Sequence, residues 1–292
     1  MHFSTTAKRF CAVGAAIAAA AAYSAQSSVA DASGATSSRT WAPAVSAAIT
    51  PGVQMYTKGA QCTANFVFTD SSGTVYVGYA AHCAGTGEAT DTNGCNTKSL
   101  PLGTKVSFVR GGSVVAGGEQ VGTGELAYSS WLTMQQTGDH NANACAFNDL
   151  ALVKVDRAFV GDVNPSVPFW GGPVGLDSNG TAVGDQVYSF GNSSLRGGVE
   201  ALSPKTGLSI GNEGNAWSHN VYTVTPGIPG DSGSGFMDAQ GHALGVLSTV
   251  QLAPLVGANG VGDLAKEVAY ASHHGMSGLE VVPGTKPFSP LL

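Results

Sequence analysis

The chain has few charged side chains, and cationic ones are especially scarce. Only 11% of its 292 residues are Asp, Glu, Lys or Arg, and 13 Lys and Arg stand against 19 Asp and Glu. Electrostatic binding to nucleic acid needs a basic surface, so this composition argues against a nucleic-acid partner. A hydrophobic content of 43% with a formal charge of −6 also excludes a disordered chain, which is polar and strongly charged.

Long apolar runs are missing as well. The longest covers 11–23, whereas a transmembrane helix needs about 20 apolar residues. The run follows Lys8 and Arg9 and precedes a small-x-small sequence that ends at Ala30, which is the pattern of an export signal. An Ala-rich helix of the folded domain is the alternative, and the position and flanks disfavour it. We therefore expect a signal peptide at 1–30 and a secreted, extracellular protein with no membrane contact after signal removal.

Residues 31–48 are rich in Ala, Ser and Thr without a clear period, which predicts a short propeptide or flexible leader. Signal removal takes away two cations, so the formal charge falls from −6 to about −8. It also removes Cys11 and leaves an even set of cysteines: Cys62, Cys83, Cys95 and Cys145. In an exported protein this set predicts two disulfides, and spacing alone leaves the three possible pairings open.

Regular strand–helix alternation is also lacking, which excludes a doubly wound parallel sheet. Short apolar or β-branched segments are instead separated by Gly, Asn-Gly and Ser-Gly, and Gly reaches 41 residues. The expected strands are 53–56, 65–68, 74–79, 105–109, 149–155, 186–190, 220–224 and 243–248. One helix is expected at 264–271, with Asp263 as its N-cap. The pattern is typical of an all-β barrel or sandwich.

Three short motifs bring together residue types that can perform acyl transfer. They are Tyr79-Ala80-Ala81-His82-Cys83, Asn148-Asp149-Leu150-Ala151-Leu152-Val153-Lys154 and Gly230-Asp231-Ser232-Gly233-Ser234-Gly235. Each has an ordinary structural explanation when taken alone: a packed histidine, a turn-capping aspartate and a glycine turn. Together they supply a base, an orienting carboxylate and a nucleophile in the order His, Asp, Ser. The α/β-hydrolases run Ser, Asp, His and the subtilisins run Asp, His, Ser, so this order favours the chymotrypsin class.

A metal site has much weaker support. The chain contains no Cys-x-x-Cys and no His-x-x-x-His, and His273-His274 lacks an evident third ligand. We expect neither a metal nor an organic cofactor.

Through these three motifs the chain resembles the trypsin/chymotrypsin-like serine proteases of the secreted bacterial branch, over roughly 49–270. The resemblance implies two packed six-stranded antiparallel β-barrels with a C-terminal helix. We expect this protease domain at 49–274, divided near 160–180, and a C-terminal tail at 275–292.

The resemblance also assigns roles to individual residues. His82 would be the general base, Asp149 its orienting partner and Ser232 the nucleophile. The backbone N–H groups of Gly230 and Ser232 would form an oxyanion hole. Cys62 would pair with Cys83, which leaves Cys95 to pair with Cys145. The interval between histidine and aspartate is long for the family, so inserted loops are expected near 86–103 and 133–146.

The substrate-binding residues implied by the resemblance are Pro226, Ser248 and Val250. Pro226 stands where trypsins carry a pocket Asp, and Leu247 stands where glutamate-specific relatives carry a His. Val250 replaces the Gly of open pockets. Together they predict a primary pocket that is not trypsin-like and that takes a small or medium apolar residue. Ser248 lies in a segment that resembles the substrate-pairing strand, and an ordinary core strand is an equal alternative.

Activation of the family by a freed N-terminus has no clear counterpart here. The chain has no basic residue followed by Ile-Val-Gly-Gly, and the nearest candidate new terminus is Ile49. Its ammonium could pair with Asp231 after cleavage. Without that cleavage, Asp231 needs another partner or activity does not need the switch.

The predicted function is that of a secreted serine endopeptidase. It would hydrolyse protein or peptide substrates through an acyl-enzyme intermediate and act as a monomer. The alternatives are a catalytically silent binding protein with the protease fold and an esterase of the same fold. A structural or adhesive β-protein would leave the order of the three motifs as a coincidence.

Overall fold

The computed structural model describes residues 39–88, 90–251 and 255–290. The predicted signal peptide and the first part of the predicted leader lie outside these residues. Strands dominate the described chain, and none of its helices is both long and apolar enough to cross a bilayer.

The N-terminal half forms an antiparallel sheet with the strand order β14-β3-β4-β7-β6-β5-β1-β2. Its strands are β1 (Gln54–Thr57), β2 (Ala60–Thr63), β3 (Val67–Thr69), β4 (Val75–Ala80), β5 (Lys105–Arg110), β6 (Glu119–Ser129), β7 (Leu150–Val155) and β14 (Glu280–Val281).

This sheet closes on itself through the segment 60–69. At one end of the segment β2 pairs with β1, and at the other end β3 pairs with β4. Between them, Ala64 N donates to Val53 O at 2.9 Å and Asn65 N donates to Gly78 O at 2.8 Å. The segment therefore acts as one bent strand, and it completes a barrel with β1, β4, β5, β6 and β7.

The C-terminal half is a closed antiparallel barrel with the order β10-β13-β12-β11-β8-β9. Its strands are β8 (Gln186–Phe190), β9 (Pro204–Glu213), β10 (Ser218–Thr223), β11 (Gly235–Met237), β12 (Ala243–Val250) and β13 (Asn259–Asp263). The expected all-β fold of two antiparallel barrels is therefore confirmed, and the chain passes from one barrel to the other between β7 and β8.

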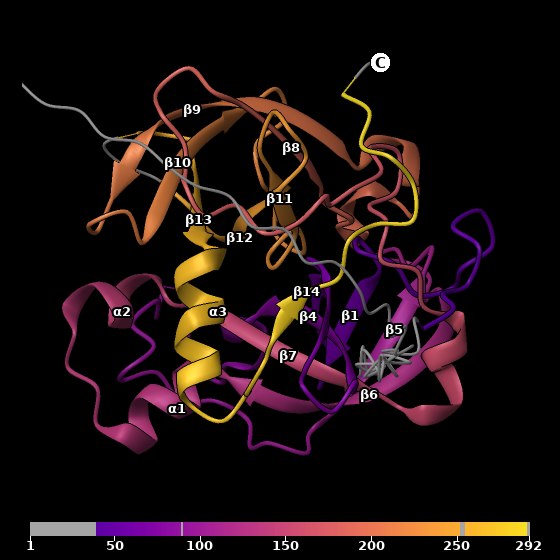
Figure 1. Ribbon diagram of the computed structural model, residues 1–292, viewed down its shortest axis with the longest axis horizontal. Helices are drawn as coiled ribbons and strands as arrows, with labels where there is room; N and C mark the ends of the chain where they lie inside the picture. The colour runs from indigo at the N-terminus through magenta and orange to yellow at the C-terminus, as the bar shows by residue number, and fades with distance from the viewer. Residues whose placement is uncertain (1–38, 89, 252–254, 291–292) are drawn as a thin grey trace, which may run out of the picture. The chain divides into compact units, whose positions relative to one another are not determined.

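The expected C-terminal helix is present as α3 (Leu264–His273). Asp263 caps it, because its side chain accepts a hydrogen bond from Lys266 N at 2.8 Å. The helix buries Leu264, Val268 and Ala271, and it packs against β12 and β13 of the second barrel and against β7 of the first (Figure 1). It thereby links the two barrels.

The predicted insertions contain two short helices, α1 (Ser130–Thr137) and α2 (Ala142–Phe147). The disulfide Cys95–Cys145 ties α2 to the loop after the histidine motif. In the described part of the chain, four 3₁₀ turns complete the regular structure: Ala81–Ala84, Arg157–Asp162, Ser194–Arg196 and Glu200–Leu202.

Several strands were not expected from the sequence: β2, β6, β9, β11 and β13, and also the two-residue β14 within the predicted C-terminal tail. Glycine and polar residues interrupt their patterns, as in the Pro-Lys-Thr-Gly start of β9. Proline is tolerated there because it is the first residue of the strand. Barrel pairing, rather than local propensity, makes these segments extended.

Both ends of the described chain contact the fold. Ala42 N donates to Val163 O at 3.0 Å, and Ala47 is buried. At the other end β14 pairs with β3, and Ser289 N donates to Trp170 O at 2.7 Å.

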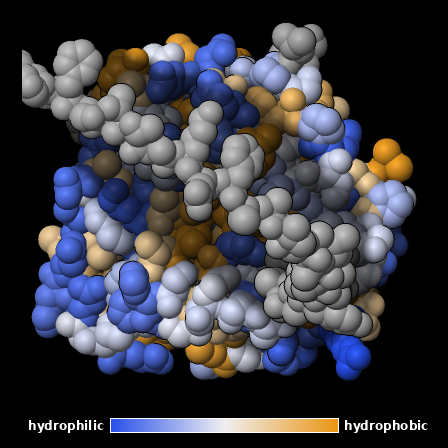
Figure 2. All heavy atoms as spheres, viewed as in Figure 1, coloured by the Kyte–Doolittle hydropathy of each residue, from blue (hydrophilic) through white to orange (hydrophobic). Residues whose placement is uncertain are grey.

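Two apolar clusters are buried: a large one that covers the first barrel and reaches into the second, and a smaller one within the second. Phe66, Phe68 and Phe108 are fully buried in the first barrel, while Val187, Phe236 and Val261 are fully buried in the second. On the face drawn in Figure 2, hydrophilic and hydrophobic residues are interspersed, as expected of a chain with so little charge.

Candidate active site

The pairing of β4 with β7 brings the histidine and aspartate motifs side by side. Ala80 lies opposite Leu150 at the ends of these strands. His82 follows β4 in a 3₁₀ turn, and Asp149 directly precedes β7. The His82 Nδ1 atom lies 2.7 Å from Asp149 Oδ2, and His82 N donates to Asp149 Oδ1 at 2.8 Å. Backbone and ring of the histidine are thus held by one carboxylate.

Asp149 is buried and forms further hydrogen bonds with the second barrel and with the C-terminal helix. Ser248 Oγ donates to Asp149 Oδ2 at 2.6 Å, so Ser248 lies beside Asp149. The Asp149 N–H donates to Glu267 Oε1 at 2.8 Å. The carboxylate is therefore held by His82 of the first barrel and Ser248 of the second, while α3 holds the backbone of Asp149.

The electrostatics of the pair favour a basic imidazole. Burial by itself lowers the pKa of His82, but the charge of Asp149 and the hydrogen bond to it outweigh burial, so the pKa is raised above 6.5. The side chain of His82 is 28% exposed, so its ring remains accessible from the cleft.

Ser232 lies in the turn before β11 and lines the same cleft as His82 and Asp149. This cleft has a volume of about 660 Å³ and takes residues from both barrels. Thr63 N donates to Ser232 O at 2.8 Å, and Gly233 N donates to Leu247 O at 2.8 Å, which anchors the turn on both barrels. Within the described residues, the Ser232 hydroxyl forms no hydrogen bond with His82, and such contacts often tighten only when substrate binds.

The turn before Ser232 has the conformation needed to present backbone N–H groups. Gly230 has φ +96°, which favours glycine, and its carbonyl accepts from Gln61 Nε2 at 3.0 Å and from Thr63 Oγ1 at 2.7 Å. Across the part of the chain that the structure describes, the N–H groups of Gly230 and Ser232 donate to no protein acceptor. Two such free donors, if they point toward the same substrate oxygen, can stabilise an oxyanion.

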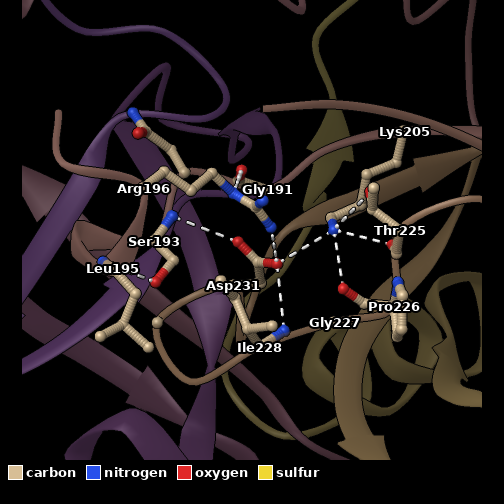
Figure 3. Close-up of polar contacts among 12 residues, drawn as sticks. Gly191, Ser193, Leu195, Arg196, Lys205, Thr225, Pro226, Gly227, Ile228 and Asp231 are labelled. Carbon is tan, nitrogen blue, oxygen red and sulfur yellow. Dashed lines mark hydrogen bonds and ion pairs between the residues drawn. The ribbon is translucent and has the colours of Figure 1, made fainter. Parts of the chain in front are cut away.

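Asp231, between these two residues, is fully buried and ion-paired with two cations (Figure 3). Its Oδ2 atom lies 2.6 Å from Arg196 Nη2 and 3.1 Å from Lys205 Nζ. The backbone N–H groups of Ser193 and Ile228 also donate to this carboxylate, each at 3.2 Å. The negative charge is therefore neutralised entirely from within the chain.

The candidate terminus Ile49 lies elsewhere. It is fully buried in the first barrel, and its N–H donates to Asp162 O at 3.1 Å. In the uncleaved chain, Asp231 is therefore paired with Arg196 and Lys205 and not with Ile49.

The predicted pocket residues are placed differently from one another. Val250 and Ser248 line the cleft, whereas Pro226 does not, although its neighbour Gly227 does. A Cβ added to Gly227 would lie 3.0 Å from Val250 Cγ2 and 3.2 Å from Leu247 Cδ2. The nearest atom to it would be Asn259 Oδ1 at 2.8 Å, so the chain around Gly227 is tightly packed against apolar and polar side chains.

Both disulfides expected from the resemblance are present, Cys62–Cys83 and Cys95–Cys145. Cys62, His82 and Cys83 also lie close enough together to resemble a metal-binding group. Their sulfur atoms are joined to each other at 2.00 Å, so no thiolate is free to bind a metal ion.

Sequence reasoning missed several residues that shape the site. Gln61 and Thr63 hold the Gly230 carbonyl, and Glu267 contacts Asp149. The Trp131 ring lies beside the His82 ring, with centroids 6.4 Å apart and planes tilted by 44°. Only Glu267 had a sequence signal, since it lies among Leu264, Val268 and Ala271 on the apolar face of its helix.

Comparison with known proteins gives the following. No family model matches the chain, and no curated protein does. Among solved structures, Thermobifida fusca protease A is similar at a TM-score of 0.49 and 16% identity, over 82% of this chain and 100% of that chain. Nocardiopsis protease is similar at a TM-score of 0.47 and 18% identity, over 80% of this chain and 98% of that chain. A glutamic acid-specific serine protease that uses a histidine triad in substrate binding is similar at a TM-score of 0.46 and 18% identity. The similarity covers 80% of this chain and 100% of that chain. Because these TM-scores and identities are low, the chemistry of this chain is argued only from its own residues.

Proposed function

We propose that this protein is a secreted serine endopeptidase with the triad His82, Asp149 and Ser232. The observation that carries the proposal is the convergence of these three residues on one cleft, with His82 bound to Asp149 at 2.7 Å. Because Asp149 occupies Nδ1 of His82, the other ring nitrogen, Nε2, is free to take the proton of the Ser232 hydroxyl and to pass it to the leaving group.

The mechanism follows from the acid–base properties of these groups. Ser232 Oγ attacks the carbonyl carbon of the scissile peptide bond while its proton passes to His82. Asp149 holds the tautomer with the proton on Nδ1 and stabilises the imidazolium. The imidazolium then protonates the leaving amine, the C–N bond breaks, and an acyl-enzyme remains. Water, activated by His82, hydrolyses this ester and restores Ser232.

The free N–H groups of Gly230 and Ser232 would bind the oxygen that becomes negative during both steps. Loss of one such donor typically costs about 10²–10³ in kcat. The carbonyl of Gly230 is already held by two side chains, so the peptide that carries this function needs little reorganisation.

For the residue before the cleaved bond, we propose a small or medium apolar side chain. Val250 and Leu247 pack close to Gly227 in the cleft, as described above. The charged residues that line the cleft besides His82 are acidic: Glu88, Asp91 and Asp149. A carboxylate in that position would find no cationic partner among the described lining residues.

We also propose that residues 1–30 direct export and are removed. Residues 42–48 contact the fold through Ala42 and the buried Ala47, so the mature chain should retain them. N-terminal sequencing of the exported protein tests both points, and a mature start after Ala48 would contradict the second.

The central test uses a fluorophosphonate and intact mass measurement on the exported protein and on Ser232→Ala. One adduct on the wild type and none on the variant is the expected result. No adduct on a correctly processed wild type would indicate a silent binding protein instead. Turnover of esters without turnover of peptide amides would indicate an esterase.

A further inference from the structure

Lys205 is a fully buried cation at the start of β9, and its ammonium pairs with Asp231, the residue before Ser232. A buried ammonium is costly unless ion pairs and hydrogen bonds replace its hydration. Burial lowers the pKa of Lys205, and the charge of Arg196 adds to this effect, while Asp231 opposes it. The Lys205 side chain must therefore be held by strong local contacts. These contacts identify the segments of the chain that Lys205 joins.

The Nζ atom has partners at both ends of one short loop (Figure 3). It lies 3.1 Å from the carboxylate of Asp231, and it donates to Thr225 O at 3.0 Å, to Thr225 Oγ1 at 3.4 Å and to Pro226 O at 3.1 Å. Thr225 and Pro226 lead into the pocket wall at 227–229, whereas Asp231 stands between the two peptides of the candidate oxyanion hole.

Arg196 provides an internal comparison. It pairs with the same carboxylate oxygen at 2.6 Å, but its other hydrogen bond goes to Gly191 O at 3.2 Å. Both cations thus neutralise Asp231, and of the two only Lys205 contacts the segment that leads into the pocket wall. The loop is also closed within itself, since Asp231 N donates to Ile228 O at 2.9 Å.

We propose that Lys205 is a positioning residue for substrate selectivity, which holds the primary pocket wall in register with the oxyanion-forming peptides. The inference rests on the proposed function and deepens it. Without the ammonium, the carbonyls of Thr225 and Pro226 lose their shared donor and the wall can shift. Asp231 would still keep Arg196 and the N–H groups of Ser193 and Ile228. The width of the pocket would then change more than the chemistry at Ser232.

The test compares Lys205→Met with Arg196→Met, because each removes one positive charge from Asp231. Substrates are peptide p-nitroanilides that differ only in the residue before the cleaved bond: Ala, Val, Leu or Phe. We expect Lys205→Met to change the kcat/KM ratio between Ala and Phe substrates by about tenfold, mainly through KM. Arg196→Met should lower kcat/KM for all four substrates by a similar factor and leave the ratios unchanged.

If either methionine variant fails to fold, the conservative pair Lys205→Arg and Arg196→Lys replaces it. Both keep the charge and move the donors, so only Lys205→Arg should alter the ratios. Unchanged ratios in an active Lys205 variant, or equal changes in the Arg196 variant, overturn this inference alone. A wild-type protein that cleaves none of the peptides and takes up no fluorophosphonate overturns the proposed function together with it.

Discussion

Replacing Glu267 by Gln should make the stability of the protein less sensitive to rising pH. Glu267 is fully buried in α3, and its Oε1 atom accepts the hydrogen bond from Asp149 N. Its Oε2 atom is buried without a hydrogen-bond partner, and no cation pairs with the carboxyl among the described residues. Gln keeps the Oε1 acceptor and the size of the side chain, and it removes the titration.

The sign of the effect follows from the direction of the pKa shift. Burial raises the pKa of Glu267 well above 4.5; the hydrogen bond from Asp149 N opposes this, and the charges of Asp149 and Asp263 add to it. The folded protein therefore keeps a proton that the unfolded chain loses near pH 4.5. The stability associated with this proton is fully present below that value and is lost as the pH rises toward the folded pKa.

The magnitude is set by one proton. Between the two pKa values, the wild type should lose up to about 1.4 kcal/mol of unfolding free energy per pH unit through this group. The Gln variant has no such loss. It brings an additional buried N–H, which costs about 1–3 kcal/mol if it stays unpaired, but this cost does not depend on pH.

The assay is urea unfolding at pH values from 4 to 8, in a Ser232→Ala background that prevents self-digestion. The difference in unfolding free energy between Gln and Glu should be flat near pH 4 and should then shift in favour of Gln. Glu267→Ala is the control for lost packing, because it removes both the acceptor for Asp149 N and the titration. Parallel wild-type and Gln curves between pH 5 and 8 would refute the reasoning, since they would show that Glu267 is ionised in the folded protein.

Four further outcomes are expected. Because the pKa of His82 is raised above 6.5, kcat/KM for a peptide amide should fall as the pH drops, with a midpoint above 6.5; a midpoint below 6 would contradict the raised value. Asp149→Asn should lower kcat by about 10⁴ through the wrong tautomer, with little change in melting temperature, and a tenfold loss would refute its role. Removing Cys95 and Cys145 together, whose bridge spans 50 residues, should lower the unfolding free energy by about 4 kcal/mol in the chain-entropy account; a loss under about 1 kcal/mol in urea would contradict it. Val250→Gly should raise kcat/KM for Phe relative to Ala before the cleaved bond by about tenfold or more, and an unchanged ratio would place the pocket elsewhere.

Much of the local structure was predictable because it depends on neighbouring residues. Asp263 caps the helix that follows it, and the alternating segments at 75–80, 105–110 and 186–190 form strands within a residue of the expected bounds. Strands β6 and β9 were not predicted, because glycine and polar residues obscure their period. Hydrogen bonds to neighbouring strands of the barrel, such as those of β9 with β8 and β10, make them extended.

The sequence by itself determined the order of the three motifs, the even number of cysteines after residue 30 and the capped C-terminal helix. Each of these is a matter of residue type and short spacing. Only the tertiary structure decided that Arg196 and Lys205 neutralise Asp231, and that Glu267 supports Asp149 from 118 residues away. Such partners depend on the register of the barrel strands and on how the helix packs across both barrels. The sequence shows which residues carry a charge, but burial in the fold makes an unpaired charge costly and so determines which partner each one needs.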